Sequence, residues 1–170
     1  MGNVVIKKSK IQGKGVFANK SFGSGKEILK IDDFHTVKSK DELTDFQNKY
    51  EADWLFHKIV IMQAPERYIN HSCNPNSYIK TVKGVRRVIA MRPIARGEEI
   101  TYDYVINGYY DSAMKCNCGS KICRKILNCN FFKLEKSIQQ KYLPYLDTWF
   151  KSAFAKKLKL MQRGSAKQYL

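Results

Sequence analysis

The sequence contains no apolar run long enough to cross a membrane. Residues 1–20 also lack the positively charged start and apolar stretch that mark a secretory signal. Neither an internal repeat nor a low-complexity linker is found, and 170 residues is the usual size of one domain. We therefore expect a soluble, intracellular protein without a membrane span, either cytoplasmic or nuclear.

Acidic residues are scarce. The chain carries 15 of them against 31 lysines and arginines, which gives a formal net charge of +16 at pH 7. The apolar fraction is 44%, so the high charge is not accompanied by the low hydrophobicity of a disordered chain. This charge exceeds what solubility needs and predicts an acidic partner, which could be nucleic acid, an anionic membrane, an acidic protein or a nucleosomal surface.

The five cysteines form an odd set that suits no disulfide framework in a reducing cytosol. Cys116, Cys118 and Cys123 lie within eight residues, and thiolates on such a tight loop can converge on the tetrahedral geometry that zinc prefers. A structural zinc site needs a fourth ligand. Cys129 is close in sequence and Cys73 is distant, and spacing alone permits either.

Hydrophobic periodicity predicts a mainly β core followed by helices. Short β-favouring runs, separated by glycine, serine and proline turns, predict strands at residues 4–6, 15–18, 27–31, 59–62, 78–82 and 88–91. Ser39 and Glu42 have capping-box spacing, which predicts a short amphipathic helix between Ser39 and His57. Its apolar face, expected to pack on the strands, comprises Leu43, Phe46 and Tyr50.

Helix dominates from Ser137 onward. Ser137 and Gln140 predict a capped helix that ends at Pro144, and a second helix begins near Tyr145. The apolar face of the second helix comprises Leu146, Trp149, Phe150, Ala153, Phe154, Leu158 and Met161. Its other face carries Lys151, Lys156, Lys157, Lys159 and Arg163 against the single acid Asp147. This basic face either docks on an anionic surface or is the solvated side of a helix packed on the core.

Three further segments carry polar groups. Residues 67–76 include Asn70 and His71, which could be a functional pair or a satisfied buried pair. Tyr102 and Tyr104 are two residues apart at the end of a strand, so both hydroxyls lie on one face and either line a polar channel or pack with hydrogen-bonded tips. Residues 12–15 form a two-glycine turn of a kind that many proteins contain.

Taken in order, these segments resemble the SET-domain protein-lysine methyltransferases over residues 7–128. Residues 13–18 are similar to the first motif of that family, residues 67–76 to its asparagine-histidine-serine-cysteine motif, and residues 97–104 to its tyrosine motif. Residues 116–123 resemble its zinc-binding post-SET segment. The trithorax branch is particularly similar over residues 97–127, whereas the short chain resembles compact microbial or viral members.

The resemblance implies a mainly β protein with some α, in the SET-domain fold of small sheets with a knot-like crossing. A zinc-binding post-SET loop and a helical C-terminal tail complete it. It implies a SET domain at residues 1–110, a post-SET zinc segment at residues 111–130, and a basic helical extension at residues 131–170 packed on the domain.

The resemblance also implies two bound groups, S-adenosylmethionine and zinc. Residues that would contact or support the cofactor are Gly13, Lys14, Gly15, Arg67, Asn70, His71, Tyr104 and Asn117. The implied zinc ligands are Cys73, Cys116, Cys118 and Cys123, which leaves Cys129 as a spare thiol.

The implied activity is methyl transfer to a lysine of a histone or another basic protein. Tyr104 matches the catalytic tyrosine, and Tyr102 matches a position where the family carries phenylalanine or tyrosine. A tyrosine there predicts monomethylation, because its hydroxyl leaves little room for a methylated amine to rotate. Trp54 either borders the cofactor or lysine channel or packs in the core. The alternative function is a non-catalytic, zinc-stabilised basic module that binds nucleic acid or an acidic protein.

Overall fold

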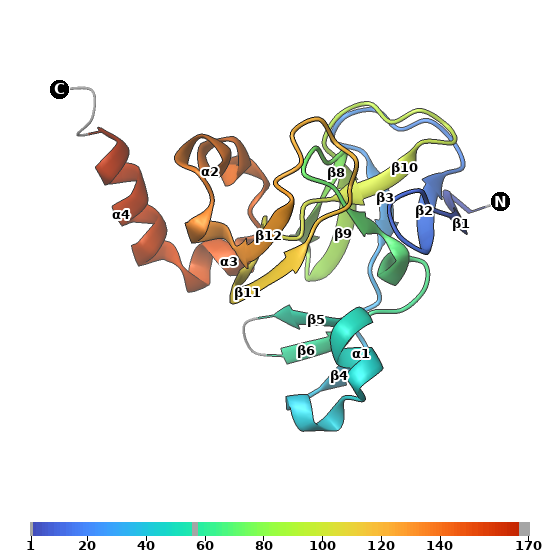
Figure 1. The fold of residues 1–170 in the computed structure, drawn as a ribbon, viewed down its shortest axis with the longest axis horizontal. Coiled ribbons are helices and arrows are strands. Elements are labelled where there is room, and N and C mark those ends of the chain that lie inside the picture. The colour runs from blue at the N-terminus through green and yellow to red at the C-terminus, as the bar shows by residue number, and fades with distance from the viewer. Residues whose placement is uncertain (1, 56–57, 167–170) are drawn as a thin grey trace.

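The computed structural model describes residues 2–55 and 58–166, with side chains as far as Met161. Small β-sheets form the centre of the molecule, a helical extension lies at one end, and an insert with its own sheet projects from the body (Figure 1). The fold is therefore mainly β with some α, as the sequence predicts. None of the described helices is long and apolar enough to span a membrane.

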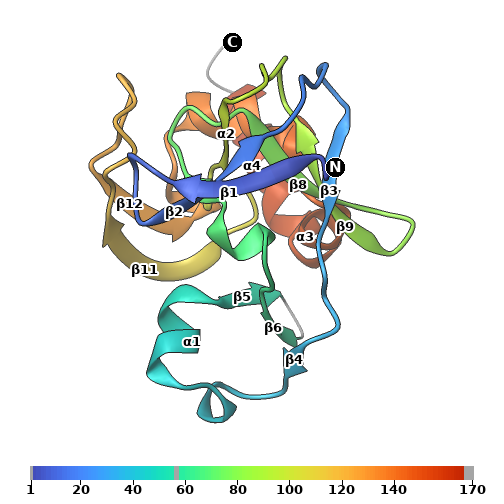
Figure 2. The same cartoon turned by 90° about the vertical axis from the view of Figure 1, so that its right-hand side faces the viewer.

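A four-stranded sheet brings the N-terminal strands together with two strands from later in the chain. Its order is β1 (Val4–Lys8), β2 (Lys14–Ala18), β10 (Glu99–Tyr102) and β7 (Asn70–His71). β1, β2 and β10 pair antiparallel, whereas β7 runs parallel to β10 with Asn70 opposite Thr101 and His71 opposite Tyr102. Figure 2 shows β1 and β2 in front of this centre.

A three-stranded sheet packs its apolar side into the main core. It comprises β3 (Glu27–Lys30), β9 (Val85–Ala90) and β8 (Ser77–Val82). β8 and β9 are joined by Lys83-Gly84, both with positive φ, which is the type I′ turn that suits the twist of a two-residue hairpin. Ile28, Val88 and Ile100 are fully buried in the same cluster, so the two sheets share one core.

The insert departs from the sequence prediction. It contains β4 (Thr36–Val37), a 3₁₀ turn (Lys40–Glu42), α1 (Asp45–Tyr50), β5 (Ala52–Leu55) and β6 (Lys58–Ile61). The predicted short helix is present as α1, but the predicted packing of its apolar face is wrong: Leu43 is extended, and Phe46 and Tyr50 are 62% and 50% exposed. Thr44 and Gln47 form a capping box that starts α1 at Asp45, so the helix is only six residues long. His57, the far bound of the segment in which the helix was predicted, lies outside the described residues.

The chain ends in a hairpin and three helices. β11 (Tyr109–Lys115) pairs with β12 (Ile126–Asn130), followed by α2 (Lys136–Tyr142), α3 (Thr148–Ala153) and α4 (Ala155–Ala166). The prediction of a single second helix is wrong, because the helix is interrupted at Phe154 between α3 and α4. The predicted cap of the first helix is also wrong, since Glu135 rather than Ser137 stands at the N-cap of α2.

These helices bury a second apolar cluster against the SET-like body. Phe131, Tyr142, Leu146 and Phe150 are almost fully buried in it together with Ile106 of the body. Ala153, expected on the same face, is exposed because the break between α3 and α4 turns it outward.

Candidate functional site

Two segments far apart in sequence cross at the centre of the protein. Besides the parallel β7–β10 pairing, the backbone N–H of Ser72 donates to Tyr102 O at 3.1 Å. The side chain of Asn76 donates to Glu99 O at 2.8 Å and accepts from Thr101 N at 2.9 Å. Residues 70–77 thus wrap around β10, which is the crossing expected from the sequence.

The crossing places two tyrosines side by side. The rings of Tyr102 and Tyr104 have centroids 4.9 Å apart, and the Tyr104 hydroxyl donates to Ile69 O at 2.9 Å. Burial raises the pKa of both hydroxyls, and the nearby carboxylate of Asp53 raises both further. Both phenols therefore stay protonated and can donate hydrogen bonds at neutral pH.

A pocket of about 930 Å³ opens beside these tyrosines. A polar part of its lining comes from Gln12, Gly13, Lys14, Arg67 and Asn70. An aromatic part comes from Trp54, Tyr102, Tyr104, Tyr110 and Trp149. A mixture of apolar walls with a few convergent polar groups is typical of small-molecule sites.

The polar wall is held by the loop between β1 and β2. The amide of Asn70 donates to Lys14 O at 3.0 Å and to Glu99 Oε1 at 2.9 Å. Gly13 has φ of +49°, and a β-carbon at Gly15 would overlap the Glu99 carboxylate. Gly13 is therefore favoured by its backbone conformation and Gly15 by the close approach of the Glu99 side chain, although Gly15 does not itself line the pocket.

Arg67 connects the insert to this wall. Its Nη1 donates to Glu51 Oε1 at 2.7 Å, and its Nη2 donates to the Tyr68 hydroxyl at 2.9 Å. Glu51 ends α1, so the ion pair fixes the position of the insert relative to the pocket. Arg67 can support a ligand in the pocket in this way without touching it.

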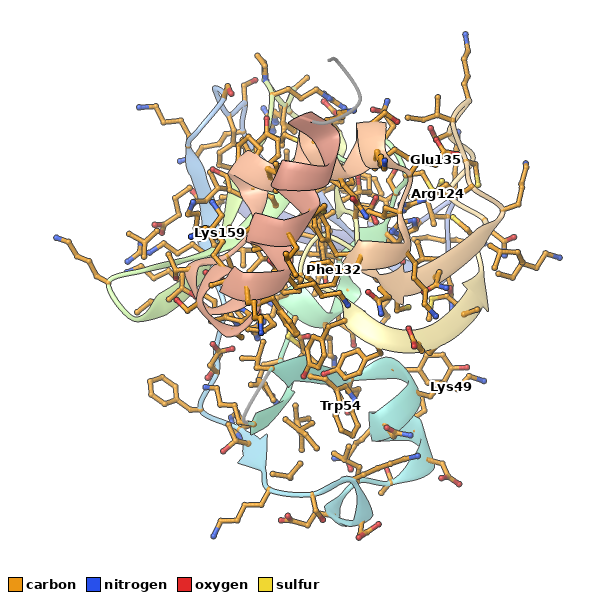
Figure 3. All side chains as sticks on the ribbon, turned by 90° about the vertical axis from the view of Figure 1, so that its left-hand side faces the viewer. Lys49, Trp54, Arg124, Phe132, Glu135 and Lys159 are labelled. Atoms are coloured by element: carbon orange, nitrogen blue, oxygen red, sulfur yellow. The ribbon has the colours of Figure 1, made fainter. Side chains whose placement is uncertain are left out.

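The tyrosines of the aromatic wall meet the insert at Trp54. Trp54 is half-buried and packs edge-on against Tyr110 with centroids 5.9 Å apart. The Tyr110 hydroxyl donates to Trp54 O at 2.8 Å and lies 2.6 Å from the Tyr109 hydroxyl. Figure 3 shows Trp54 projecting from the insert toward the body. Trp54 therefore lines the pocket rather than packing in the core.

Thiols from two distant parts of the chain, Cys73 and the loop at residues 116–123, meet beside the crossing. The ligand atoms of His71, Cys73, Cys116 and Cys118 all lie within 4.8 Å of one another, and the Cys73 and Cys116 sulfurs are 3.8 Å apart. Four sulfurs about 2.3 Å from a tetrahedral zinc would be about 3.8 Å apart, so this spacing fits zinc. Cys123 adjoins the group, with its Sγ 3.7 Å from Cys116 O.

Of the two candidates for a fourth thiol, Cys73 lies with the loop cysteines and Cys129 does not. Cys73 is buried within the group, whereas Cys129 lies on β12 and lines the pocket. His71 was not expected among these thiols; its Nε2 lies 3.4 Å from Cys73 Sγ. Burial lowers the pKa of His71 to about 4, so the ring is neutral and its Nδ1 accepts from Tyr104 N at 3.3 Å.

Asp103 joins the thiols to the tyrosines. Asp103 is 1% exposed, and its carboxylate accepts two 2.7 Å hydrogen bonds from Nη2 of Arg124. The Nε of the same arginine lies 3.4 Å from Cys73 Sγ. Because Asp103 stands between Tyr102 and Tyr104, the loop of cysteines and the paired tyrosines are mechanically coupled. Neither Asp103 nor Arg124 carries a local sequence signal, since each is one charged residue in a polar stretch.

A second buried ion-pair network was also missed by sequence analysis. Arg86 on β9 is 4% exposed and binds Asp33 through Nε and Nη2 and Asp53 through Nη1. Arg86 and Asp53 both line the pocket. These residues are 20 or more positions apart, so only the fold brings them together.

Two of the remaining predicted cofactor residues are placed away from the pocket lining. Asn117 is exposed beside Cys116, and His71 faces the thiols. Their contact with a cofactor stays a prediction.

Comparison with known proteins decides the family. The SET-domain profile matches residues 13–105, more than half of the chain. The chain belongs to the SET-domain family. This SET-domain chain is 33% identical over 141 residues to the histone-lysine N-methyltransferase trithorax of Drosophila virilis, and 31% identical over 143 residues to the human histone-lysine N-methyltransferase 2B. Each match covers 74% of the chain but only 4% and 5% of those relatives.

A shorter relative and a solved structure agree with this assignment. The H3 lysine-36-specific histone-lysine N-methyltransferase of Candida glabrata is 31% identical over 140 residues, covering 71% of this SET-domain chain and 19% of the relative. A crystal structure of a histone methyltransferase candidate from Plasmodium falciparum has a TM-score of 0.52 at 22% identity, covering 61% of this chain and 94% of that one. The latter likeness supports the SET-domain fold.

Proposed function

We propose that this SET-domain chain is a protein-lysine N-methyltransferase that uses S-adenosylmethionine. The observation that carries the proposal is the β7–β10 crossing, which holds Asn70 and the Tyr102–Tyr104 pair at one pocket. Relatives that match most of the chain are named histone-lysine methyltransferases, which supports the same activity.

The residues at the pocket fit the cofactor. Gly13 lines the pocket with backbone alone and has open space beside it, and Asn70 fixes its loop through Lys14 O. We assign cofactor binding to the set predicted from the sequence: Gly13, Lys14, Gly15, Arg67, Asn70, His71, Tyr104 and Asn117. S-adenosylmethionine supplies a methyl group on a positively charged sulfur. The enzyme has then to position a neutral lysine amine in line with it.

Tyr104 is the catalytic residue in this proposal. Its hydroxyl is held by Ile69 O and stays protonated, so its oxygen can accept from the substrate amine and orient the nitrogen lone pair. A free lysine has a pKa of about 10.4, and the pocket walls lower it by desolvation. The amine loses its proton to solvent before it attacks, and no covalent enzyme intermediate is needed.

Tyr102 sets the product in the same proposal. Its ring lies 4.9 Å from that of Tyr104, and its hydroxyl is available to hold a water or the amine itself. An amine held there has little room to rotate after one methyl group is added. We assign monomethylation to the unmodified protein.

Zinc completes the proposed enzyme as a structural ion. Its ligands are Cys73, Cys116, Cys118 and Cys123, supported by the 3.8 Å spacing of the first two sulfurs. Zinc held there would fix the segment that carries Asn70 and His71. The division into a SET domain at 1–110, a post-SET segment at 111–130 and an extension at 131–170 follows the same assignment.

The substrate in this proposal is a lysine of a histone or another basic protein. The test is incubation with labelled S-adenosylmethionine and a panel of histones, nucleosomes and basic peptides, followed by mapping of the methylated residue. Tyr104→Phe should abolish labelling while cofactor binding, measured by calorimetry, persists. Tyr145→Phe, away from the pocket lining, is the matched control and should label normally. Near-normal turnover by Tyr104→Phe would refute the assignment.

A further inference from the structure

The helical extension carries positive charge that neither the core nor the pocket uses. We define the basic surface as Lys80 of β8 with Lys151, Lys156, Lys157 and Lys159 of α3 and α4. The four lysines of the extension are exposed, and α4 contains no acidic residue. Figure 3 looks onto this side of the molecule, with Lys159 on the outer helix.

Asp147, the one acid on these helices, forms no salt bridge with the lysines and only partly offsets their charge at Lys151. Asp147 is fully buried, caps α3 through Thr148 N and accepts from Thr81 N and Oγ1. Lys151, Lys156 and Lys159 have no carboxylate within salt-bridge distance in the described part of the chain. Partial burial lowers the pKa of Lys151, and the neighbouring ammonium of Lys80 lowers it further. Holding like charges together costs stability unless an anion binds between them.

The apolar side of the helices is already occupied. Leu146, Phe150 and Leu158 are buried in the second core, and Leu160 is the only large apolar side chain of α3 and α4 that is exposed among the described residues. One leucine gives little apolar area for insertion into a lipid surface, which argues against membrane docking. No aromatic side chain of the described extension is exposed either, so there is no platform on which unpaired bases could stack.

We propose that the basic surface binds the phosphate backbone of duplex nucleic acid. Its described charges are all lysines, which bind phosphates as point charges, and sequence-independent binding to a duplex backbone needs no more than such a cluster of charges. Trp149, two residues before Lys151, lines the pocket. A duplex on the surface would therefore bring lysines of proteins bound to the same duplex near the pocket.

Binding of a short fluorescent DNA duplex across a range of salt concentrations tests the proposal without cofactor or substrate. The triple variant Lys156→Gln, Lys157→Gln, Lys159→Gln should bind at least about tenfold more weakly at 0.1 M salt, and its log–log salt slope should fall by about 3. The control is Lys20→Gln, Lys26→Gln, Lys30→Gln, three exposed lysines of the SET-like body. The two triples are matched because each removes one lysine whose ammonium lies over a phenylalanine ring, Lys157 over Phe132 and Lys20 over Phe22.

Further arms separate charge from folding and from other partners. Lys156→Arg, Lys157→Arg, Lys159→Arg should keep binding, and the glutamine variant should keep its melting temperature and its methyl transfer to a free peptide. Duplex RNA should compete like DNA, whereas single strands should compete weakly. Equal loss in both glutamine triples would overturn the proposal, as would tighter binding to acidic peptides or anionic vesicles than to the duplex. DNA binding by a protein that transfers no methyl group would support this inference and contradict the proposed enzyme.

Discussion

The Tyr142 hydroxyl donates a 2.9 Å hydrogen bond to Oδ2 of Asp103, which links the helical extension directly to the strand end that carries the paired tyrosines. Tyr142 is 2% exposed and lies at the end of α2, and Asp103 separates Tyr102 from Tyr104. The extension is therefore part of the support of the candidate active site.

Tyr142→Phe should destabilise the protein by about 2 kcal/mol, because the buried Asp103 carboxylate loses one of its hydrogen bonds. Chemical denaturation measures this difference. The Tyr145 hydroxyl makes no hydrogen bond within the described chain, so Tyr145→Phe should change the free energy of unfolding by about 0.5 kcal/mol or less. Equal losses in both variants would show that ring packing, and not the Asp103 bond, is responsible.

Tyr102→Phe should shift the product from monomethyl-lysine to higher methylation states. The change removes the hydroxyl beside Tyr104 and leaves space for a methylated amine to turn. Mass spectrometry of a peptide substrate over time would record the change. Efficient trimethylation by the unmodified protein would contradict the assigned role of Tyr102.

Arg86→Ala should cost about 3 kcal/mol of folding stability, since Asp33 and Asp53 would lose their shared guanidinium. Arg87→Ala is the matched control on the same strand. It removes only a pair with the more exposed Glu27, so we expect a loss of about 1 kcal/mol or less. Adding Asp33→Asn and Asp53→Asn to Arg86→Ala should recover part of the loss; no recovery would mean that the charges are not the cause.

Metal removal should unfold the loop of cysteines and disturb the crossing through Cys73. We expect the purified protein to contain one zinc ion, and chelation to lower the melting temperature by roughly 10 °C or more, reversibly on adding zinc. Elemental analysis and thermal unfolding measure both effects. Cys118→Ser should reproduce the loss of zinc, whereas Cys129→Ser, outside the group of thiols, should leave zinc content unchanged. A metal-free protein of unaltered stability would refute the zinc assignment.

The sequence by itself determined the family and most of the β core. Its short strands could be predicted because β-favouring runs bounded by glycine, serine and proline turns are local signals, as at residues 4–6 and 78–82. The resemblance to the SET-domain family implied the crossing of residues 67–76 with the segment that ends at Tyr104, and β7 pairs with β10 there. The high positive charge could likewise be predicted from the composition.

Tertiary structure alone decided which distant side chains meet. Cys73 rather than Cys129 joins the thiols, Arg86 gathers Asp33 and Asp53, and Trp149 of the extension reaches the pocket. Contacts of this kind have no periodicity, because each partner comes from a different element. The predicted packing of Phe46 and Tyr50 failed for a related reason: their spacing fits the helix that forms, but the fold turns them toward the pocket and solvent rather than the core.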